Sequence, residues 1–430
     1  MSDSTPDPRI AAVRLLQRLS APGSHLGSLS RQPEFQALAD RDRRFLMQLA
    51  YGVERERGKL DFYISRLSKR PLHKLDAPVL WILRLALFQI LNLRVPQRAA
   101  VHEAVESCRR LGVTSAGGFV NALLRRFLRQ QPPLPQGRRA EDLAVRTSHP
   151  LWLVRRYLKR FGWRRAERLL HVNNSPPESC FWVNTRRQSL REMGRLLEEA
   201  GIGYSPWPDL PEALKVDASL AAHRLAEEGR GFFMDAGSQQ VLHGLDLEET
   251  RLVADVCAAP GSKAFLLAAR MPSEARLYAC DRSFRRLGQA QRRQRSLRLP
   301  GLAFIQADWR RGSVLAPRCD FILADVPCSG LGTLRSNPDI RWKFQEADLA
   351  RLQRLQSDIL ANAYGSLRPG GRLLYVTCSS EEEENEQVVE AFLDSDPQAR
   401  LLQPFEFSLH SRRPGDAFFS ALLGKPGQDY

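Results

Sequence analysis

Phe321-Ile-Leu-Ala-Asp325-Val-Pro327-Cys328-Ser-Gly330 is the stretch that decides the fold of this chain. An apolar run that ends in an acid and continues into Pro, Cys, Ser and Gly is typical of a buried parallel strand that opens into a tight loop. In open α/β sheets, ligands bind at that edge of the sheet. The thiol of Cys328 is therefore either a reactive group or a small buried apolar residue, because buried free cysteines are common.

The sequence around this stretch alternates strands and helices from about residue 231 onward, which predicts a doubly wound parallel sheet. Asp281, Asp308 and Asp325 each end one of three consecutive expected strands, so the sequence directs three carboxylates to one edge of the sheet. A further strand ends at Cys378. If the strands that end near Cys328 and Cys378 are neighbours, both thiols face one crevice. The expected strands cover residues 251–256, 275–281, 301–308, 321–325 and 372–378.

The loop after the first of these strands, Cys257-Ala-Ala-Pro-Gly261-Ser-Lys263, has the composition of a ligand-binding turn. Small residues and one glycine let the backbone approach a ligand at a helix N-terminus, where free N–H groups favour a carboxylate or a phosphate. The loop is not GxGxxG, which disfavours a dinucleotide. Asp281 follows Gly261 by about twenty residues, the place from which a carboxylate accepts hydrogen bonds from ribose hydroxyls.

An acidic run, Glu381-Glu-Glu-Glu384, follows Cys378. Ser380 and Glu383 have the spacing of a helix capping box, and the acids would oppose the positive end of a helix dipole. We therefore expect a structural role for this run, without a metal.

The N-terminal part of the chain predicts an all-helical bundle. Apolar residues recur at helical spacing between residues 9 and 130, and residues 78–93 form the most apolar segment, a central helix. A proline-rich linker at 130–139 cannot continue a helix and marks the first domain boundary. We expect a helical domain at 1–135, a small α+β module at 145–230 and a Rossmann-like α/β domain at 231–430.

Charge and cysteine usage restrict the partners. The 64 Lys and Arg exceed the 48 Asp and Glu, for a net charge of +16, which favours a polyanion, most often nucleic acid. Seven scattered cysteines without a CxxC pair disfavour a disulfide framework and a zinc site. With neither a signal peptide nor a long apolar run in this sequence, we expect a cytoplasmic protein with no membrane or metal partner.

Four motifs in the helical part resemble the NusB-type RNA-binding domain. They are Leu83-Arg-Leu-Ala, Val95-Pro96, Val101-His-Glu-Ala-Val and Gly118-Phe-Val-Asn121-Ala-Leu-Leu-Arg. The resemblance implies that basic helix ends bind RNA, although any one of these arginines taken alone is better explained as part of a solvated helix face. The candidates are Arg109, Arg110, Arg125, Arg126 and Arg129.

The C-terminal part resembles the RNA 5-methylcytosine methyltransferases that use S-adenosylmethionine. The motifs are Asp255-Val-Cys-Ala-Ala-Pro-Gly-Ser-Lys263, Asp325-Val-Pro-Cys-Ser-Gly-Leu-Gly-Thr333, Asn337-Pro-Asp-Ile-Arg-Trp-Lys343, and Thr377-Cys-Ser with the downstream Glu384-Asn-Glu386. The domain order is similar to that of a bacterial branch of the family that methylates 16S ribosomal RNA. Ser262 and Ala417 depart from the family pattern, which usually has glycine at both positions.

The resemblance implies methylation of cytosine carbon 5 through a covalent cysteine–C6 adduct, with Cys378 as nucleophile and Cys328 acting in product release. Asp325 would activate the base, and Lys263 is a further catalytic candidate. The implied S-adenosylmethionine site comprises Cys257, Ala258, Ala259, Pro260, Gly261, Ser262, Lys263, Asp281, Arg286, Asp308 and Asp325. The implied RNA contacts are Arg125, Arg126, Pro327, Arg341 and Lys343.

Unassembled 16S ribosomal RNA is the partner that this resemblance implies, for a monomeric enzyme. Three alternatives stay open: methylation of another RNA such as transfer RNA, methylation of an exocyclic amine, and a noncatalytic role in RNA binding or ribosome assembly. An exocyclic-amine enzyme typically has an aromatic residue at the position of Cys328 and needs no thiol.

Overall fold

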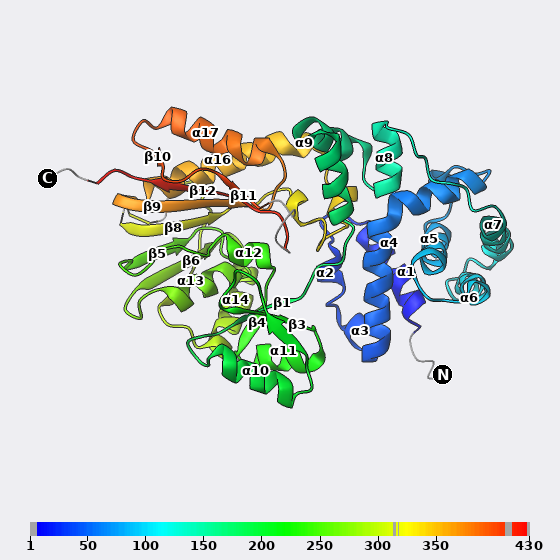
Figure 1. Cartoon of the computed structure of the whole chain (residues 1–430), viewed down its shortest axis with the longest axis horizontal. Helices are drawn as coiled ribbons and strands as arrows, with labels where there is room; N and C mark the ends of the chain where they lie inside the picture. Colours follow the sequence, from blue (N-terminus) through cyan, green and yellow to red (C-terminus); the bar gives the residue numbers. More distant parts are fainter. Residues whose placement is uncertain (1–6, 313–314, 317, 409–414, 428–430) are drawn as a thin grey trace. The chain divides into compact units, whose positions relative to one another are not determined.

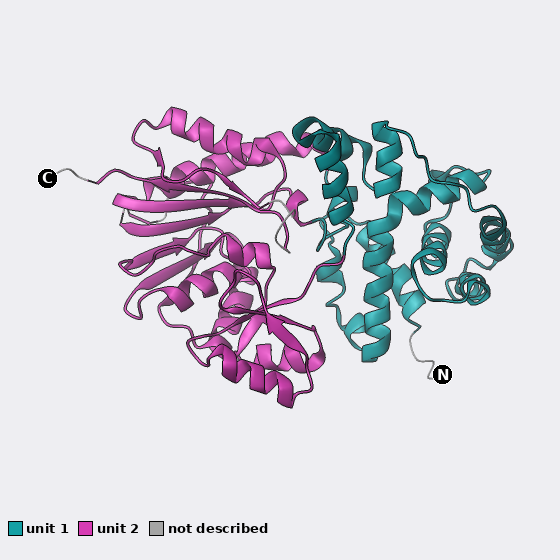
Figure 2. Ribbon diagram, viewed as in Figure 1, with its two compact units in different colours: residues 1–175, 334–344 teal, residues 176–333, 345–430 magenta. Residues whose placement is uncertain are grey.

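The computed structural model describes residues 7–312, 315–316, 318–408 and 415–427. The chain forms two compact units (Figure 2). The helical unit contains residues 1–175 and, from much later in the sequence, 334–344. The other unit, called the catalytic unit after the activity expected for it, contains residues 176–333 and 345–430.

The helical unit is a bundle around α5 (Ala77–Asn92), whose apolar side chains are buried on most of its circumference. Pro78 occupies the first turn of this helix, where its missing N–H leaves no bond unmade. The central helix predicted at 78–93 is thereby confirmed. The other α-helices in the described part of this unit are α1 (Pro8–Leu19), α2 (Leu26–Leu29), α3 (Pro33–Gln36), α4 (Asp40–Leu67), α6 (Gln97–Arg110), α7 (Gly117–Gln130), α8 (Ala140–Thr147), α9 (Leu151–Val172) and α15 (Ile340–Lys343).

Helix α9 belongs to the helical unit, whereas we expected its residues in the small module at 145–230. Helix α8, most of which precedes that module, belongs to the helical unit as well. Ser148, which follows α8, accepts a hydrogen bond of 2.7 Å from the backbone N–H of Gly58 in α4. The proline-rich linker at 130–139 ends α7 but is not the boundary of the unit. The composition of a linker determines where a helix ends, and it does not determine where the next helix packs.

A small antiparallel sheet in the order β2-β3-β1-β4 opens the catalytic unit. Its core contains Phe181, Val183 and Leu214 of the sheet and Met193 and Leu197 of α10. β4 pairs with β1, so this sheet continues past residue 230, where we had expected the module to end. The elements are β1 (Cys180–Val183), α10 (Leu190–Glu199), β2 (Tyr204–Pro206), β3 (Ala213–Val216), α11 (Leu220–Glu227) and β4 (Gly231–Phe233).

Within the described residues the large sheet has eight strands, in the order β10-β12-β9-β8-β5-β6-β7, with β11 paired to β12. Neighbours from β9 to β7 are parallel, and β12 runs antiparallel to β9. The strand order reverses between β5 and β8, so the crevice for a ligand lies at their carboxyl ends. The strands are β5 (Leu252–Asp255), β6 (Arg276–Asp281), β7 (Leu302–Gln306), β8 (Cys319–Asp325), β9 (Leu367–Thr377), β10 (Arg400–Leu401), β11 (Glu406–Phe407) and β12 (Phe419–Gly424).

Helices cover both faces of this sheet (Figure 1). Alternate residues of β8 point to opposite faces: Phe321 and Leu323 pack in one core with α13 and α14, while Ile322 and Ala324 pack in a second core with α16 and α17. Burial on both faces explains why β8 reads as a continuous apolar run. The helices are α12 (Ala236–Gln240), α13 (Ser262–Arg270), α14 (Phe284–Leu297), α16 (Leu349–Gly365) and α17 (Glu386–Ser395).

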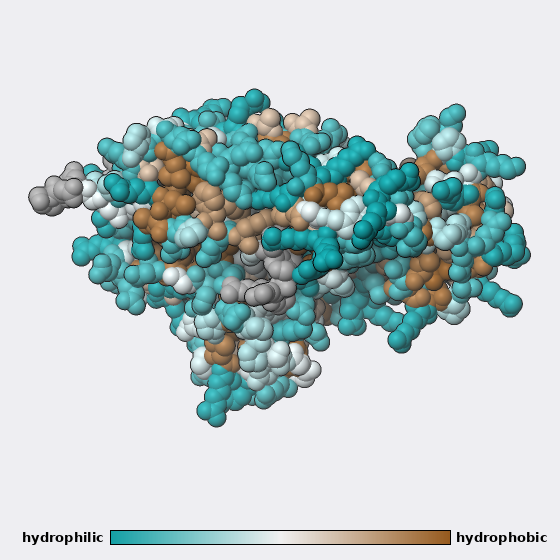
Figure 3. Space-filling view, turned by 45° about the horizontal axis from the view of Figure 1, so that its top comes forward, coloured by the Kyte–Doolittle hydropathy of each residue, from teal (hydrophilic) through white to brown (hydrophobic). Residues whose placement is uncertain are grey.

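The face of the molecule in Figure 3 is mostly hydrophilic, with apolar residues in scattered patches. Among the residues with described positions, no helix is both long and apolar enough to cross a membrane.

Candidate active site

A pocket of about 460 Å³ lies at the carboxyl edge of the large sheet, a volume typical of small-molecule sites. β8 and β9 are parallel neighbours with Asp325 opposite Val376, so the loops after both strands begin at the same level. The two expected cysteines therefore reach one crevice. The chemically important residues that line the pocket are Cys257, Asp281, Arg286, Asp308, Asp325, Cys328 and Cys378.

The sulfur atoms of Cys328 and Cys378 lie 3.0 Å apart, and the backbone N–H of Cys378 donates to the sulfur of Cys328 at 3.3 Å. The hydrogen bond with Cys378, followed by burial, raises the pKa of Cys328 well above its ordinary value. The thiol of Cys328 therefore stays protonated at neutral pH, and it can donate a hydrogen bond to the sulfur of Cys378.

Lys263 and Asp325 form an ion pair beside the thiols, with 2.7 Å between the ammonium nitrogen and Oδ2. Burial lowers the pKa of Lys263, but attraction to Asp325, the hydrogen bond to it and the charge of Cys378 raise that pKa above its ordinary value. Lys263 thus remains a cation although only 8% of it is exposed.

Asp255 is a buried acid at the end of β5 that we did not include among the expected site residues. Its Oδ1 accepts from the N–H of Cys257 at 3.2 Å, while its Oδ2 has no partner within the described ranges. Burial, followed by repulsion from Asp325, raises the pKa of Asp255 to about 8. Asp255 is consequently protonated at neutral pH and can donate a hydrogen bond. Its position at a strand end was visible in the sequence, but its burial was not.

The loop between β5 and α13 is shaped for close approach of a ligand. Gly261 has φ +104°, and a Cβ there would lie 2.5 Å from the ring of Phe265, so glycine is required. Ala258 and Ala259 are buried, and Pro260 is exposed at the pocket. Burial and the neighbouring acids raise the pKa of Cys257 well above its usual value, which argues against a nucleophilic role for this thiol.

Asp281 and Arg286 hold this loop from β6 and α14. Asp281 accepts a hydrogen bond from the N–H of Ala259 at 3.2 Å, and Arg286 donates to the carbonyl oxygen of Ala259. The carboxylate of Asp281 retains lone pairs for ribose hydroxyls. Together with the N-terminus of α13 and the orphan oxygen of Asp255, these groups fit an adenosyl amino acid such as S-adenosylmethionine.

Asp308 lies in the same pocket, just beyond β7. Its hydrogen bonds with Arg310 hold the pKa of Asp308 at about 2, against the smaller opposing effect of burial. Asp308 is therefore an anion at every physiological pH.

The two departures from the family pattern fit the structure. The hydroxyl of Ser262 accepts from Arg293 at 3.4 Å in the first turn of α13. Ala417 is buried, and its N–H donates to the carbonyl oxygen of Gly332 at 2.9 Å.

Glu384, which belongs to the motif Glu384-Asn-Glu386, supports the two cysteine loops in a role that the sequence did not predict. It is fully buried, and its Oε1 accepts from the N–H of Ser329 at 2.8 Å and from the side chain of Gln356 at 2.9 Å. Its Oε2 accepts from the hydroxyl of Ser379. Glu384 therefore ties the residue after Cys328 to the residue after Cys378.

Our expectation of a helix capping box at Ser380 and Glu383 is wrong. The hydroxyl of Ser380 bonds to Glu381, and α17 begins only at Glu386 after a short 3₁₀ turn, Glu382–Glu384. Glu381 and Glu384 of the acidic run turn inward, and Glu384 accepts hydrogen bonds from buried N–H and hydroxyl groups of the two cysteine loops.

The five expected RNA contacts occupy different environments. Pro327 is exposed at the pocket, and Arg125 is exposed on α7. Arg126 donates to the carbonyl oxygen of Leu67 at the end of α4. Lys343 donates to the carbonyl oxygen of Ser24.

Our expectation that Arg341 contacts RNA is wrong. Arg341 is 0% exposed and hydrogen-bonded to protein carbonyl groups, where RNA cannot reach it. Its position in a polar motif gave no sign of this burial.

Within residues 7–312, 315–316, 318–408 and 415–427, no cluster of three or more His, Cys, Asp or Glu is arranged to hold a metal ion.

Three family descriptions match consecutive parts of the chain. The NusB family matches residues 6–129, a ferredoxin-like domain of RsmF/B-like methyltransferases matches 149–223, and 16S rRNA methyltransferase RsmB/F matches 242–421. The ferredoxin-like match includes the strands and helices of the small sheet from β1 to much of α11, together with α9.

Relatives of similar length match almost the whole chain. Ribosomal RNA small subunit methyltransferase B of Klebsiella pneumoniae is 32% identical over 432 residues, covering 97% of this chain and 98% of that protein. The protein of the same name from Escherichia coli O1:K1 is 32% identical over 427 residues, with the same coverage.

Solved structures agree on the fold. The crystal structure of PH0851 has a TM-score of 0.83 at 24% identity and covers 99% of this chain and all of that one, 100%. NSun6 from Pyrococcus horikoshii, solved with SFG, has a TM-score of 0.57 at 20% identity over 63% of this chain and 97% of that one. With near-complete coverage by relatives at 32% identity, the chain belongs to the 16S rRNA methyltransferase RsmB/F family, whose members are S-adenosylmethionine-dependent ribosomal RNA methyltransferases.

Proposed function

We propose that this enzyme methylates carbon 5 of a cytosine in 16S ribosomal RNA through a covalent bond between Cys378 and carbon 6. The observation that carries this proposal is the pair of thiols 3.0 Å apart, next to the Lys263–Asp325 ion pair, in the pocket of the strand-end aspartates. Carbon 5 of cytosine is a poor nucleophile, so addition of a thiolate to carbon 6 is needed to activate it. Methylation of an exocyclic amine would need no such pair.

Cys378 is the nucleophile in this proposal, and two neighbouring groups support its attack. Cys328 donates a hydrogen bond from its high-pKa thiol, and Lys263 supplies a positive charge. The thiolate attacks carbon 6, and the electron pair of the C5–C6 double bond moves onto the ring. Asp325 stands beside the base to stabilise the charge that develops there, through a proton or a hydrogen bond at N3.

S-adenosylmethionine supplies an electrophilic methyl group when it is bound. Asp281 would hold the ribose hydroxyls, Asp308 would lie on the adenine side, and the loop from Cys257 to Lys263 would hold the methionine end, with Arg286 supporting that loop. After the new C5–methyl bond has formed, carbon 5 loses its proton to a base, the C5–C6 double bond re-forms, and the bond between carbon 6 and Cys378 breaks. Cys328, in contact with the departing sulfur, assists this release.

We infer that RNA binds in part to the helical unit. Arg98, His102, Arg125 and Arg129 line a groove of about 780 Å³ on α6 and α7, together with Asn121. Several cations at one groove fit a phosphate backbone better than scattered solvated arginines do. Pro327 would contact RNA at the pocket, where the target base must be unstacked to enter.

A mechanism-based substrate tests the chemistry. A stable protein–RNA complex should appear on a denaturing gel when the enzyme is incubated with S-adenosylmethionine and a 16S transcript that contains 5-fluorocytosine. Release of the adduct requires removal of a proton from carbon 5, and a carbon 5 that carries fluorine has no such proton. Digestion and peptide mass analysis should place the nucleotide on Cys378. A transcript with unmodified cytosine is the control. If 16S RNA gains its methyl group elsewhere than on cytosine carbon 5, the proposal fails.

A further inference from the structure

The segment 334–344 belongs to the helical unit although it follows the loop of Cys328 in sequence (Figure 2). On its N-terminal side lies the 3₁₀ turn Leu331–Thr333 of the catalytic unit, and on its C-terminal side the 3₁₀ turn Glu346–Asp348 leads into α16. The chain therefore leaves the catalytic unit, is fixed among the N-terminal helices, and returns.

Arg341 is the centre of this fixation. Its guanidinium donates to the carbonyl oxygens of Ser148 at 3.1 Å, Asn173 at 3.2 Å and Leu334 at 3.3 Å, and to Oδ1 of Asn174 at 2.7 Å. Burial, followed by repulsion from Arg55, lowers the pKa of Arg341 to about 9. Burial of a guanidinium among neutral oxygens carries a large desolvation cost, so it contributes little to the stability of the fold. Its planar fork of N–H groups nevertheless fixes several groups in one geometry.

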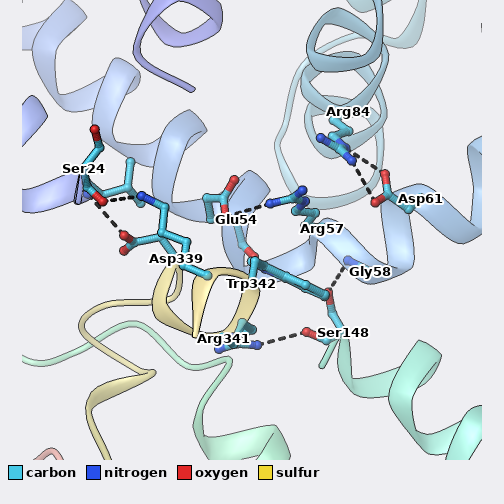
Figure 4. A network of polar contacts seen from close by, with 12 residues as sticks. Ser24, Glu54, Arg57, Gly58, Asp61, Arg84, Ser148, Asp339, Arg341 and Trp342 are labelled. Atoms are coloured by element: carbon cyan, nitrogen blue, oxygen red, sulfur yellow. Dashed lines mark hydrogen bonds and ion pairs between the residues drawn. The ribbon is translucent and has the colours of Figure 1, made fainter. Parts of the chain in front are cut away.

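The neighbours of Arg341 make further contacts with the helices (Figure 4). The indole N–H of Trp342 donates to the carbonyl oxygen of Glu54 at 2.8 Å, and the guanidinium of Arg57 lies 5.4 Å from the Trp342 ring centroid. Asp339, which is 1% exposed, accepts from the N–H of Leu26 at 3.4 Å. The segment is thus held from α4, from α2 and from the residues around α8 and α9.

The other end of the connection is tied to the cysteine pair. The N–H of Gly332 donates to the carbonyl oxygen of Cys378 at 2.9 Å, and a Cβ on Gly332 would lie 2.3 Å from the carbonyl oxygen of Ala417. Leu334, the acceptor of Arg341, is separated from Gly332 by Thr333 alone. Consecutive Cα atoms are only about 3.8 Å apart, so a displacement of Leu334 also displaces Gly332, two residues away.

We propose that Arg341 is a positioning residue for the methyl-transfer reaction, through which the helical unit fixes the loop that carries Cys328 relative to Cys378. This inference rests on the proposed role of the two thiols. It gives the helical unit a part in the chemical step, in addition to RNA capture. A misplacement of about 1 Å at a reacting group reduces rates by up to about a hundredfold.

Two variants of the full-length protein test this role: Arg341→Lys, which keeps the charge but loses the fork, and insertion of one glycine between Thr333 and Leu334. The insertion leaves the contacts of Arg341 in place but lengthens the connection by about 3.8 Å. Both should slow single-turnover methylation of a 16S transcript by about tenfold to a hundredfold. The Kd values for S-adenosylmethionine and RNA should stay unchanged.

Arg84→Lys is the matched control. Arg84 is also buried in the helical unit, where it pairs with Asp61 at 2.7 Å and 2.8 Å, and it makes no contact with the segment 334–344 among those described. It should lower the melting temperature while leaving the single-turnover rate of the folded protein unchanged. The inference is overturned if the glycine insertion reacts at the wild-type rate, or if Arg84→Lys slows the reaction as much as Arg341→Lys.

Failure of this inference and failure of the proposed function give different results. If Cys378→Ala still methylates RNA, the thiol mechanism is wrong whatever Arg341 does. If Cys378→Ala is inactive and the insertion is fully active, the mechanism stands and the positioning role does not. Should Arg341→Lys fold poorly, the insertion variant decides alone.

Discussion

Cys328 and Cys378 place their sulfur atoms 3.0 Å apart, although fifty residues separate them in the chain. The contact is possible because β8 and β9 are parallel neighbours whose following loops share one edge of the sheet. The pair is asymmetric, since the pKa of Cys328 is raised by its bond to Cys378 and by burial.

This asymmetry predicts opposite outcomes for the two cysteine variants. Cys378→Ala should abolish methyl transfer, because no thiolate reaches carbon 6. Cys328→Ala should still form the adduct but release it slowly, and a slowly migrating protein–RNA band on a denaturing gel would show it. Cys319→Ala serves as a control, because Cys319 is buried at the start of β8, away from the pocket. Normal turnover by Cys378→Ala would refute the assignment.

Glu384→Ala should destabilise the site and reduce activity. It removes the acceptor of the Ser329 N–H, the Ser379 hydroxyl and Gln356, and each buried group left unpaired costs about 1–3 kcal/mol. Thermal unfolding and single-turnover rates would measure both effects. Glu384→Gln keeps one oxygen and should lose less. Glu390→Ala, at an exposed position of α17, should behave like the wild type.

Glu54→Gln should stabilise the protein above neutral pH. Burial raises the pKa of Glu54 to about 7, so the folded protein holds a proton that the unfolded chain releases near pH 4.5. Wild-type stability therefore falls as pH rises from about 4.5 to 7, by up to about 3 kcal/mol from this carboxyl, and the Gln variant lacks that loss. Denaturant unfolding from pH 5 to 9 would measure the difference. If the stability advantage of the Glu54→Gln variant over the wild type becomes smaller as the pH rises, this prediction is contradicted.

Replacing Arg98, Arg125 and Arg129 together by Gln should weaken RNA binding and make it less dependent on salt. Each lost phosphate contact on single-stranded RNA lowers the slope of log K against log salt by about 0.7, so three contacts give up to about 2. Filter binding to a 16S fragment over a range of salt concentrations would report the slope. Arg66→Gln, an exposed arginine outside this groove, is the control. An unchanged slope would exclude the groove as the binding surface.

The sequence by itself determined the strands, the acids and thiols at their ends, and the family. A strand buried on both faces must be continuously apolar, and a turn that approaches a ligand must consist of small residues. The sequence alone therefore predicted the strand residues Phe321–Ala324 and the turn residue Gly261.

Only the tertiary structure decided the environments of the polar residues. Glu384 and Arg341 look like surface residues in sequence, yet both are fully buried, because loops distant in the chain needed an acceptor in one case and a donor in the other. The burial of Asp255, which raises its pKa, depends in the same way on what packs around β5. Burial of a polar group is decided by its partners in space, and local sequence patterns do not contain those partners.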